Sequence, residues 1–431
     1  MLRSDVVSLD KRHLWHPYTA ADEFALIDPL VVARAQGARL YDADGRSYLD
    51  GNAQWWVAGL GHNHPRLIAA LKQQADRFCH VSLAGVTHEP AAHLAEELVA
   101  IAPAGLSRAF FSDDGSTAIE CALKMAVQFW QQSGQSKKQR FVALDGAFHG
   151  ETLGATSLGG VEIFRRPYAG LLFDCLRARP PYDESSFAET FAALSSLLKT
   201  ANNQIAALVL EPLVQGANGM RIYAPKFLQA ARALCNEHDV LLIVDEVFTG
   251  LGRTGKMWAC EHAAIAPDIL CSAKALGGGL LPFAATLATE RIFDAFRGDR
   301  SRMFYYGHSF GGNPLGAAVA REMLRVFADE KILDGITERS DRIAHTFSAL
   351  GNISGTSRPR ALGMIGAIDL PSANGYHSSI GWRVFEEAKK RGAYLRPLGD
   401  VVYVTPALNI PLSDLGELLQ IVRESVISAA G

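Results

Sequence analysis

Residues 240–279 read VLLIVDEVFTGLGRTGKMWACEHAAIAPDILCSAKALGGG, and two short apolar runs in this stretch decide the fold class. The runs, 240–246 and 268–272, are apolar almost throughout and do not alternate with polar residues. Continuous apolar runs of this length indicate strands that are covered on both faces, as in a parallel sheet. We therefore expect two central strands here, each of which ends close to an ionisable residue.

Further apolar runs predict more strands, and stretches of helical period lie between them. The runs are 108–112, 140–144, 205–211 and 283–289, and the amphipathic stretches are 116–132 and 225–238. Strands that alternate with helices predict an α/β unit in which a mostly parallel sheet lies between helices.

The last part of the chain predicts a smaller α+β unit. From residue 312 the pattern changes to helical stretches at 312–328, 335–350, 380–392 and 412–429, with strand candidates at 364–370 and 401–406. A chain of 431 residues exceeds the size at which one core usually stops growing. We expect a large domain over 76–330 and a C-terminal small domain over 331–431. Residues 1–75, irregular and rich in aromatic residues, should contribute to the small domain and the active site.

Composition excludes several classes of function. Lys and Arg total 42 against 45 for Asp and Glu, a net charge of -3 without charged blocks, so nothing attracts nucleic acid or an anionic membrane. The six cysteines stand singly, without a CxxC pair, which is typical of reduced core residues in a cytosolic protein. No uncharged apolar stretch approaches the roughly 18 residues of a membrane span, and the N-terminus lacks a signal-peptide core. We expect a cytoplasmic protein.

Two motifs suggest ligands that the sequence does not support. Residues 250–256, GLGRTGK, match the dinucleotide pattern GxGxxG and the opening of the Walker pattern GxxxxGK. The Walker pattern fails at Met257, where a Ser or Thr should hold magnesium. The dinucleotide pattern fails because about 12 residues separate Gly255 from the next run, too few for a crossover helix. The histidine and cysteine candidates do not have metal-ligand spacing, so we predict no metal; they are His62, His64, Cys260 and His262.

Asp245 and Lys274 each close one of the two central runs. The ligand crevice of an open parallel sheet lies at the carboxyl ends of its strands, so the two side chains should converge on one site. A lysine at the end of a buried strand is unfavourable unless it is paired or reactive. Pyridoxal phosphate needs a lysine for its Schiff base and an aspartate that keeps its ring nitrogen protonated. The alternatives are a lysine that reaches solvent, a plain salt bridge, or an aspartate that caps the following turn.

A candidate anion site lies at the start of the stretch 116–132. There Gly115 and Ser116 would present N–H groups and a hydroxyl where the helix dipole favours an anion, such as the cofactor's phosphate. The alternative is a simple N-cap. Phe148, which lies beside His149 after another apolar run, could stack on a pyridine ring.

Residues 241–279 resemble the signature of the class III pyridoxal-phosphate aminotransferases, a fold type I group of ω-amino acid and diamine transaminases. The resemblance extends over nearly the whole chain. It implies that Lys274 forms the Schiff base, that Asp245 binds the ring nitrogen and that the fold is that of type I enzymes. It also implies a homodimer with shared active sites. The implied cofactor-binding residues are Gly115, Ser116, Phe148, Asp245, Lys274, His308 and Ser309, the last reaching the phosphate of the neighbouring subunit. The implied substrate-binding residues are Tyr18, Trp55, Trp56, Phe148, Gly307, Arg396 and Tyr403.

Several segments are similar to the branch of this family that serves biotin biosynthesis. They are HLWHPYT (13–19), DGNAQWW (50–56), GLGHNHP (59–65) and LRPLGDVVYVTP (395–406). This resemblance implies conversion of 8-amino-7-oxononanoate to 7,8-diaminononanoate with S-adenosylmethionine as amino donor. A substrate with a long methylene chain and a carboxylate suits an aromatic slot at Trp55 and Trp56 and a guanidinium at Arg396.

Two residues differ from the pattern of the adenosylmethionine-using members and leave the donor open. Those members carry Tyr at the position of Phe148 and Pro at the position of His308, whereas GHSF resembles members that use lysine. The other hypotheses are a different class III transaminase, a non-catalytic cofactor-binding regulator, and a nucleotide-binding protein built on 250–256.

Overall fold

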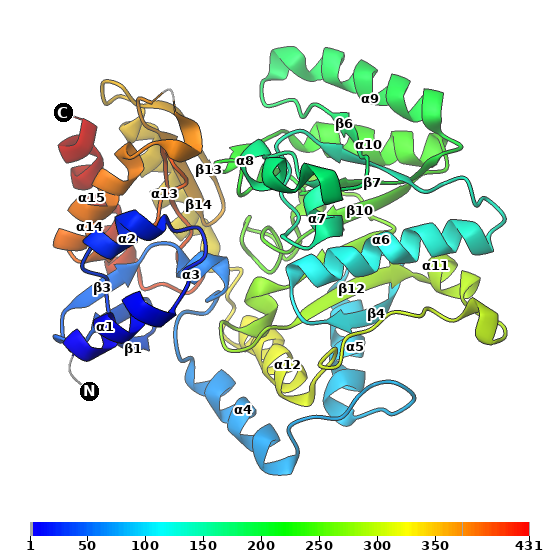
Figure 1. The fold of residues 1–431 in the computed structure, drawn as a ribbon, viewed down its shortest axis with the longest axis horizontal. Coiled ribbons are helices and arrows are strands. Elements are labelled where there is room, and N and C mark those ends of the chain that lie inside the picture. Colours follow the sequence, from blue (N-terminus) through cyan, green and yellow to red (C-terminus); the bar gives the residue numbers. More distant parts are fainter. Residues whose placement is uncertain (1–2, 373, 431) are drawn as a thin grey trace.

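A large sheet forms the centre of the first unit in the computed structural model, which describes residues 3–372 and 374–430 (Figure 1). Within these residues the sheet has seven strands, in the order β4-β12-β11-β10-β7-β5-β6. Their bounds are β4 Leu106–Ser112, β5 Arg140–Leu144, β6 Leu176–Ala178, β7 Ile205–Leu210, β10 Leu241–Asp245, β11 Ile269–Ser272 and β12 Ala284–Thr289. Only β12 runs antiparallel to its neighbours in this described sheet. The mostly parallel sheet predicted from the sequence is confirmed, and β6 was missed because its three residues form no continuous apolar run.

Helices cover both faces of this sheet (Figure 1). The helix α6 (Gly115–Gln132) contacts β10, β11 and β12, whereas α10 (Pro225–Glu237) contacts β10 and α9 (Phe187–Ala201). On β4 lies α5 (Glu89–Ile101), against which α12 (Pro314–Asp329) packs. The helices α6, α10 and α12 lie where the helical period predicts them.

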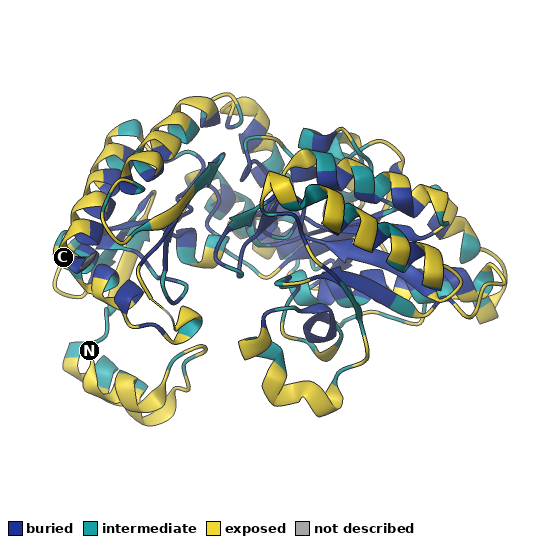
Figure 2. Cartoon of the chain, turned by 90° about the horizontal axis from the view of Figure 1, so that it is seen from above, coloured by how far each residue is buried: buried dark blue, intermediate teal, exposed yellow. Residues whose placement is uncertain are grey.

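The central strand β10 shows why its sequence is apolar throughout. All five of its residues are buried. Leu241 and Ile243 belong to the core that includes the inner face of α6, whereas Leu242 and Val244 belong to the core on the other face. Figure 2 shows this double coverage as a buried sheet between helices whose outer faces are exposed.

The second unit combines a small antiparallel sheet with three long helices. The sheet has the order β13-β14-β16, with bounds Ser357–Leu362, Ile365–Asp369 and Val401–Val404. The helices α13 (Ile336–Leu350), α14 (Ile380–Lys390) and α15 (Leu412–Ala430) lie where their period predicts them. The sequence SRPRAL of β13 was not recognised, because it is largely polar and its residues are exposed or half-buried.

The expectation that the first 75 residues are irregular is wrong. They form α1 (Arg3–His13), α2 (Ala21–Leu26), the strands β1 (Val32–Gln36), β2 (Arg39–Asp42) and β3 (Ser47–Asp50), the short α3 (Ala53–Trp56), and most of α4 (Pro65–Arg77). The strand β3 pairs in parallel with β15 (Ala393–Tyr394), which lies far away in the sequence. These strands are short, and β1 is mostly exposed, so they show no apolar run that a local pattern can detect.

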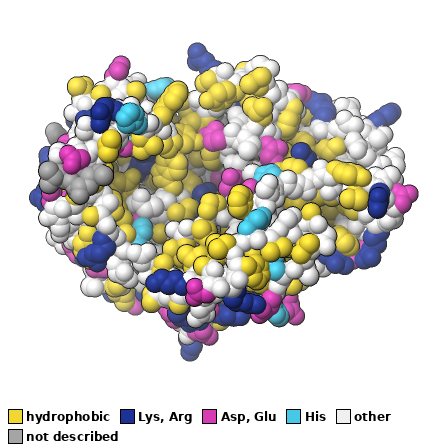
Figure 3. All heavy atoms as spheres, turned by 60° about the horizontal axis from the view of Figure 1, so that its bottom comes forward, with side chains coloured by type: hydrophobic (Ala, Val, Ile, Leu, Met, Phe, Trp, Pro, Cys, Tyr) yellow, Lys and Arg dark blue, Asp and Glu magenta, His cyan; other side chains and the backbone are white. Residues whose placement is uncertain are grey.

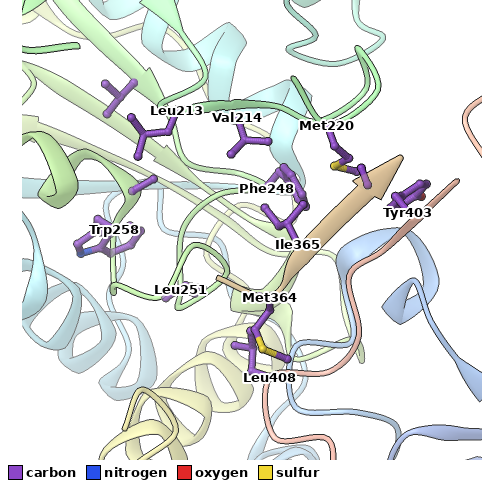
Figure 4. Packing of buried hydrophobic residues seen from close by; sticks show 14 of the residues in the cluster. Leu213, Val214, Met220, Phe248, Leu251, Trp258, Met364, Ile365, Tyr403 and Leu408 are labelled. Carbon is purple, nitrogen blue, oxygen red and sulfur yellow. The ribbon is translucent and has the colours of Figure 1, made fainter. Parts of the chain in front are cut away.

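The glycine-rich loop 250–256 packs the two units together. Arg253 is buried, and its Nη1 donates to the carbonyl of Pro406 over 2.7 Å, while its own carbonyl accepts from the Met364 amide over 2.9 Å. Gly363, with φ of +56°, approaches so closely that a Cβ would lie 2.3 Å from the Thr254 carbonyl carbon. Around this loop one core extends across both units, and Figure 4 shows Leu251 between Trp258 on one side and Met364 and Leu408 on the other. The loop therefore serves packing.

The six cysteines are all free, and most are buried as expected. Cys121, Cys235, Cys260 and Cys271 are buried and Cys175 is half-buried. The expectation of a core position is wrong for Cys79, which is exposed just after α4. Among the residues with a described structure, no helix is long and apolar enough to cross a membrane.

Candidate active site

A cavity of about 600 Å³ lies at the carboxyl ends of the parallel strands. Each strand that reaches it contributes a polar or aromatic residue just after or at its end, as the crevice rule for open sheets requires. The residues that close the strands and line the cavity are Asp113 after β4, Phe148 and His149 after β5, Glu211 after β7, Asp245 at the end of β10 and Lys274 after β11.

Lys274 begins a short 3-10 turn (Lys274–Gly277) directly after β11 and its backbone has φ of 44°. A non-glycine residue in this left-handed region is strained by about 1–3 kcal/mol, which is tolerated mainly at functional sites. Its Nζ lies 4.9 Å from the ring centroid of Trp56. Within the described structure we find no hydrogen bond or ion pair to Nζ, so the plain salt bridge with Asp245 is not formed. Burial lowers the pKa of Lys274, while the carboxylates of Asp245 and Glu211 act in the opposite direction.

Asp245 is buried and held in place from two sides. Its Oδ2 accepts a hydrogen bond from His149 Nδ1 at 2.6 Å, and its Oδ1 accepts from the Val247 amide at 3.0 Å. The imidazole of His149 is itself fully buried. A carboxylate fixed in this way can accept a further proton-bearing nitrogen without moving. His149 was noted in the sequence only as a neighbour of Phe148, and nothing in the local pattern signals its bond to Asp245.

The start of α6 lines the cavity at Gly115 and Ser116 and is a candidate anion site. Asp114 caps the helix by accepting from the Thr117 amide at 2.9 Å, so the cap does not use Ser116. The Ser116 hydroxyl lines the cavity and accepts from the Glu151 amide at 3.2 Å. A Cβ on Gly115 would lie 2.6 Å from the Val247 side chain, and this close approach requires glycine. The dipole and the first N–H groups of this 18-residue helix favour a bound anion.

Aromatic rings form the outer wall of the cavity. Tyr18, Trp55, Trp56 and Phe148 all line it. Tyr18 packs edge-on to Trp55 at 5.2 Å, and its hydroxyl donates to Glu151. Burial raises the pKa of Glu151, and burial and the bond to Glu151 raise that of Tyr18. The wall therefore joins the N-terminal segment to the loop beside the anion site.

Two of the expected substrate residues stand behind this wall. Tyr403 is buried in β16, and its hydroxyl accepts from Trp56 Nε1 at 3.3 Å. The guanidinium of Arg396 lies 5.1 Å from the ring centroid of Trp55, and Nη2 donates to the Tyr18 carbonyl at 3.2 Å. Both residues contact the aromatic wall and do not themselves line the cavity.

Three expected residues lie apart from the cavity of their own chain. Gly307 and Ser309 are exposed, and His308 is half-buried. His308 Nδ1 lies 2.8 Å from Asp113 Oδ2 and its Nε2 lies 3.0 Å from the Tyr306 hydroxyl. His308 thus reaches the cavity edge only through Asp113 in the described structure.

Glu211 is a cavity residue that the sequence analysis missed. It is buried, and its two carboxylate oxygens accept from the amides of Phe148 and Gly216, each at 3.0 Å. Burial, with a smaller contribution from Asp245, raises the pKa of Glu211 to about 7. The signal was present, since Glu211 follows an apolar run just as Asp245 does.

The residues of the cavity fit a flat ring that carries an anionic group. The candidate anion site at Gly115 and Ser116, the fixed carboxylate of Asp245 and the Lys274 amine line one cavity. Phe148 and Val247 supply apolar surface beside them. This donor set matches the phosphate, the ring nitrogen and the aldehyde of pyridoxal phosphate.

Comparison with known proteins places the chain in a family. The family model described as aminotransferase class-III matches residues 20–426. The adenosylmethionine-8-amino-7-oxononanoate aminotransferase of Synechococcus elongatus is 44% identical, with 94% of this chain and 96% of that protein covered. The crystal structure of the enzyme of that name from Methanocaldococcus jannaschii has a TM-score of 0.95 at 34% identity, with 100% of both chains covered. The PLP-bound amine transaminase of an uncultivated Pseudomonas species has a TM-score of 0.91 at 29% identity, with 97% and 99% covered. The chain therefore belongs to the class-III aminotransferases.

Proposed function

We propose that this aminotransferase binds pyridoxal phosphate and converts 8-amino-7-oxononanoate to 7,8-diaminononanoate in biotin biosynthesis, with S-adenosylmethionine as amino donor. The observation that carries the proposal is the unpaired Lys274 in one cavity with the fixed carboxylate of Asp245. The names of the Synechococcus relative and the Methanocaldococcus structure support the substrates. The cysteines are free, and this supports the cytoplasmic location that we expect for this pathway.

In this proposal the cofactor supplies a carbonyl that exchanges an amino group and a ring that withdraws electrons from the reacting carbon. Lys274 Nζ holds the cofactor and, once released, moves a proton to or from the reacting carbon. Its lowered pKa leaves more of the amine unprotonated and able to accept that proton. Asp245 accepts the ring N–H, and Gly115 and Ser116 bind the phosphate. Phe148 would supply apolar surface to the ring and would exclude water.

The long-chain substrate would extend along the aromatic wall. Tyr18, Trp55 and Trp56 offer apolar surface for its methylene chain. Arg396, which stands over Trp55 and uses one N–H for the Tyr18 carbonyl, has further donors for a carboxylate. Tyr403 acts by holding Trp56, and Gly307 would contact substrate from the neighbouring subunit.

The second candidate is the same reaction with lysine as donor. The observation that favours it is at Phe148 and His308, which differ from the adenosylmethionine-using pattern. Phe148 brings no hydroxyl to the cavity, and His308 adds an imidazole beside Asp113 at its edge. An imidazole next to a carboxylate offers polar partners to the second amino group of a diamine donor.

A homodimer completes the site in this proposal. Gly307 and Ser309 do not line the cavity of their own chain in the described structure, so we place Ser309 at the phosphate end of the neighbouring subunit's site. Large apolar side chains are exposed, including Trp15 at 93%, Tyr305 at 74% and Phe310 at 62%. Figure 3 shows a face over whose centre hydrophobic side chains gather around a hollow. Exposed apolar area of this kind is typical of an interface.

A half-reaction without acceptor tests the proposal and separates the donors. The purified, cofactor-loaded protein is mixed separately with S-adenosylmethionine and with lysine, and the absorption spectrum reports conversion to the aminated cofactor. Conversion by S-adenosylmethionine supports the main proposal, and conversion by lysine alone supports the second. Conversion by neither contradicts both.

A further inference from the structure

Glu211 is a buried carboxylate of the active-site cavity to which the proposed reaction assigns no task. It lies directly after β7 and is 5% exposed. Its Oε2 accepts from the Phe148 amide and its Oε1 accepts from the Gly216 amide, both at 3.0 Å. One side chain therefore ties together the loop after β5 and the turn after β8 (Val214–Gln215).

The bond from the Phe148 amide to Glu211 fixes the backbone of a residue that would supply apolar surface to the cofactor. Because Glu211 holds the Phe148 amide, it fixes the backbone position from which the Phe148 side chain reaches the cavity. The other support for that ring is an edge-on contact with Phe164 at 5.6 Å. Phe164 belongs to the short helix Glu162–Arg165, whose residues are exposed or half-buried. The tether by Glu211 is thus the buried and more rigid of the two supports.

The charge of Glu211 acts on Lys274. The charged and titratable groups that line the cavity are Lys274, Asp245, His149, Glu211, Asp113, Asp114, Glu151 and Tyr18. Behind Glu211 the Tyr223 hydroxyl donates to the Glu211 carbonyl at 2.5 Å. The carboxylate raises the pKa of Lys274, in opposition to burial. Glu211 is therefore a second anion, besides Asp245, that favours a protonated nitrogen on Lys274.

We propose that Glu211 is a positioning residue with two separable effects: its two acceptor oxygens hold the Phe148 and Gly216 backbones and so fix Phe148 where the cofactor would bind, and its negative charge favours the protonated form of the Lys274 nitrogen. Both effects rest on the proposed function, because both are measured on the bound cofactor.

Two substitutions separate charge from position. Glu211→Gln keeps the length of the side chain, removes the charge and leaves one acceptor oxygen for the two amides. Glu211→Asp keeps the charge and is too short to reach both amides, so it shows what loss of the tether does by itself. Glu246→Gln is a matched control. Glu246 is also buried, burial also raises its pKa to about 7, and it also accepts from two amides, those of Ala259 and Cys260, but it does not line the cavity.

The measurement is a pH titration of the visible absorption band of pyridoxal phosphate bound to each protein, together with the circular dichroism of that band. Above pH 7, where Glu211 is ionised, we expect Glu211→Gln to lower the midpoint by about one pH unit because a neighbouring anion is lost. We expect Glu211→Asp to keep the midpoint and to lose dichroism, because the Phe148 ring is less well fixed. The control should change neither.

The outcomes discriminate between this inference and the proposed function. An unchanged midpoint in Glu211→Gln, or an equal change in Glu246→Gln, overturns the charge effect. Unchanged dichroism in Glu211→Asp overturns the tether. If Glu211→Gln does not fold, the dichroism of Glu211→Asp decides whether the inference stands. A wild-type protein that shows no visible band with pyridoxal phosphate overturns the proposed function, and the inference with it.

Discussion

Replacing His149 by leucine removes the hydrogen bond that the imidazole donates to Asp245 Oδ2 over 2.6 Å. Both side chains are buried, at 0% and 5% side-chain exposure, so bulk water does not replace the lost donor. A hydrogen bond to a charged group contributes about 1.5–3 kcal/mol, and an energy of this size corresponds to about a 10- to 100-fold change in an equilibrium constant. Asp245 would keep the bond from the Val247 amide and lose the one that fixes its second oxygen.

We therefore expect the dissociation constant of pyridoxal phosphate to rise by about 10- to 100-fold in His149→Leu. The assay is a titration of the cofactor-free protein, followed by the visible absorption of the bound cofactor. The controls are the melting temperature, which shows that the variant is folded, and the same substitution in an Asp245→Asn background. There the change should be less than about threefold, because the shared interaction is already lost. A folded His149→Leu protein with unchanged cofactor affinity would refute the reasoning.

Three further predictions concern catalysis and stability. Lys274→Ala should abolish transamination while the protein stays folded, and multiple turnovers at a rate near that of the wild type would contradict its role. Arg360→Met should lower the free energy of unfolding by about 2 kcal/mol in denaturant titration, because the buried Asp369 loses its buried partner at 2.7 Å and keeps only the exposed Arg358; a loss below about 1 kcal/mol would show that the pair contributes little. Burial raises the pKa of Glu246 from 4.5 to about 7, so its contribution to stability is present below pH 4.5 and is lost as the pH rises through 7. Glu246→Gln should flatten this decline in unfolding free energy between pH 4.5 and 7, and an unchanged slope would assign the decline to other groups.

The strands of the large sheet were predictable because their signal is local. Each residue of β10 is buried, since helices cover both faces, and the chain therefore needs an unbroken apolar run at 241–244. The N-terminal sheet gave no such signal. Its strand β3 is completed by Ala393–Tyr394, and the sequence does not specify a pairing between segments so far apart.

The candidate site was predictable to the extent that it follows from strand ends. Asp245 and Lys274 close adjacent parallel strands, so their convergence follows from the crevice rule. The same rule applies to Glu211 but does not tell whether an acid after a strand faces the cavity or a loop. The roles expected for Tyr18, Trp55 and Arg396 came from family resemblance, because neither spacing nor periodicity distinguishes a cavity wall from an ordinary core.

By itself, the sequence determined the α/β class, most strands of the large sheet and the two ionisable residues that close its central strands. These features depend on periodicity and on the order of residues along a few turns or one strand. Only the tertiary structure decided that His149 binds Asp245, because β7 lies between the strands that carry them. It also decided that Glu211 holds Phe148 and that the loop 250–256 packs the two units together. Such contacts join residues that are distant in the chain, and their energies depend on burial and distance, which no local pattern contains.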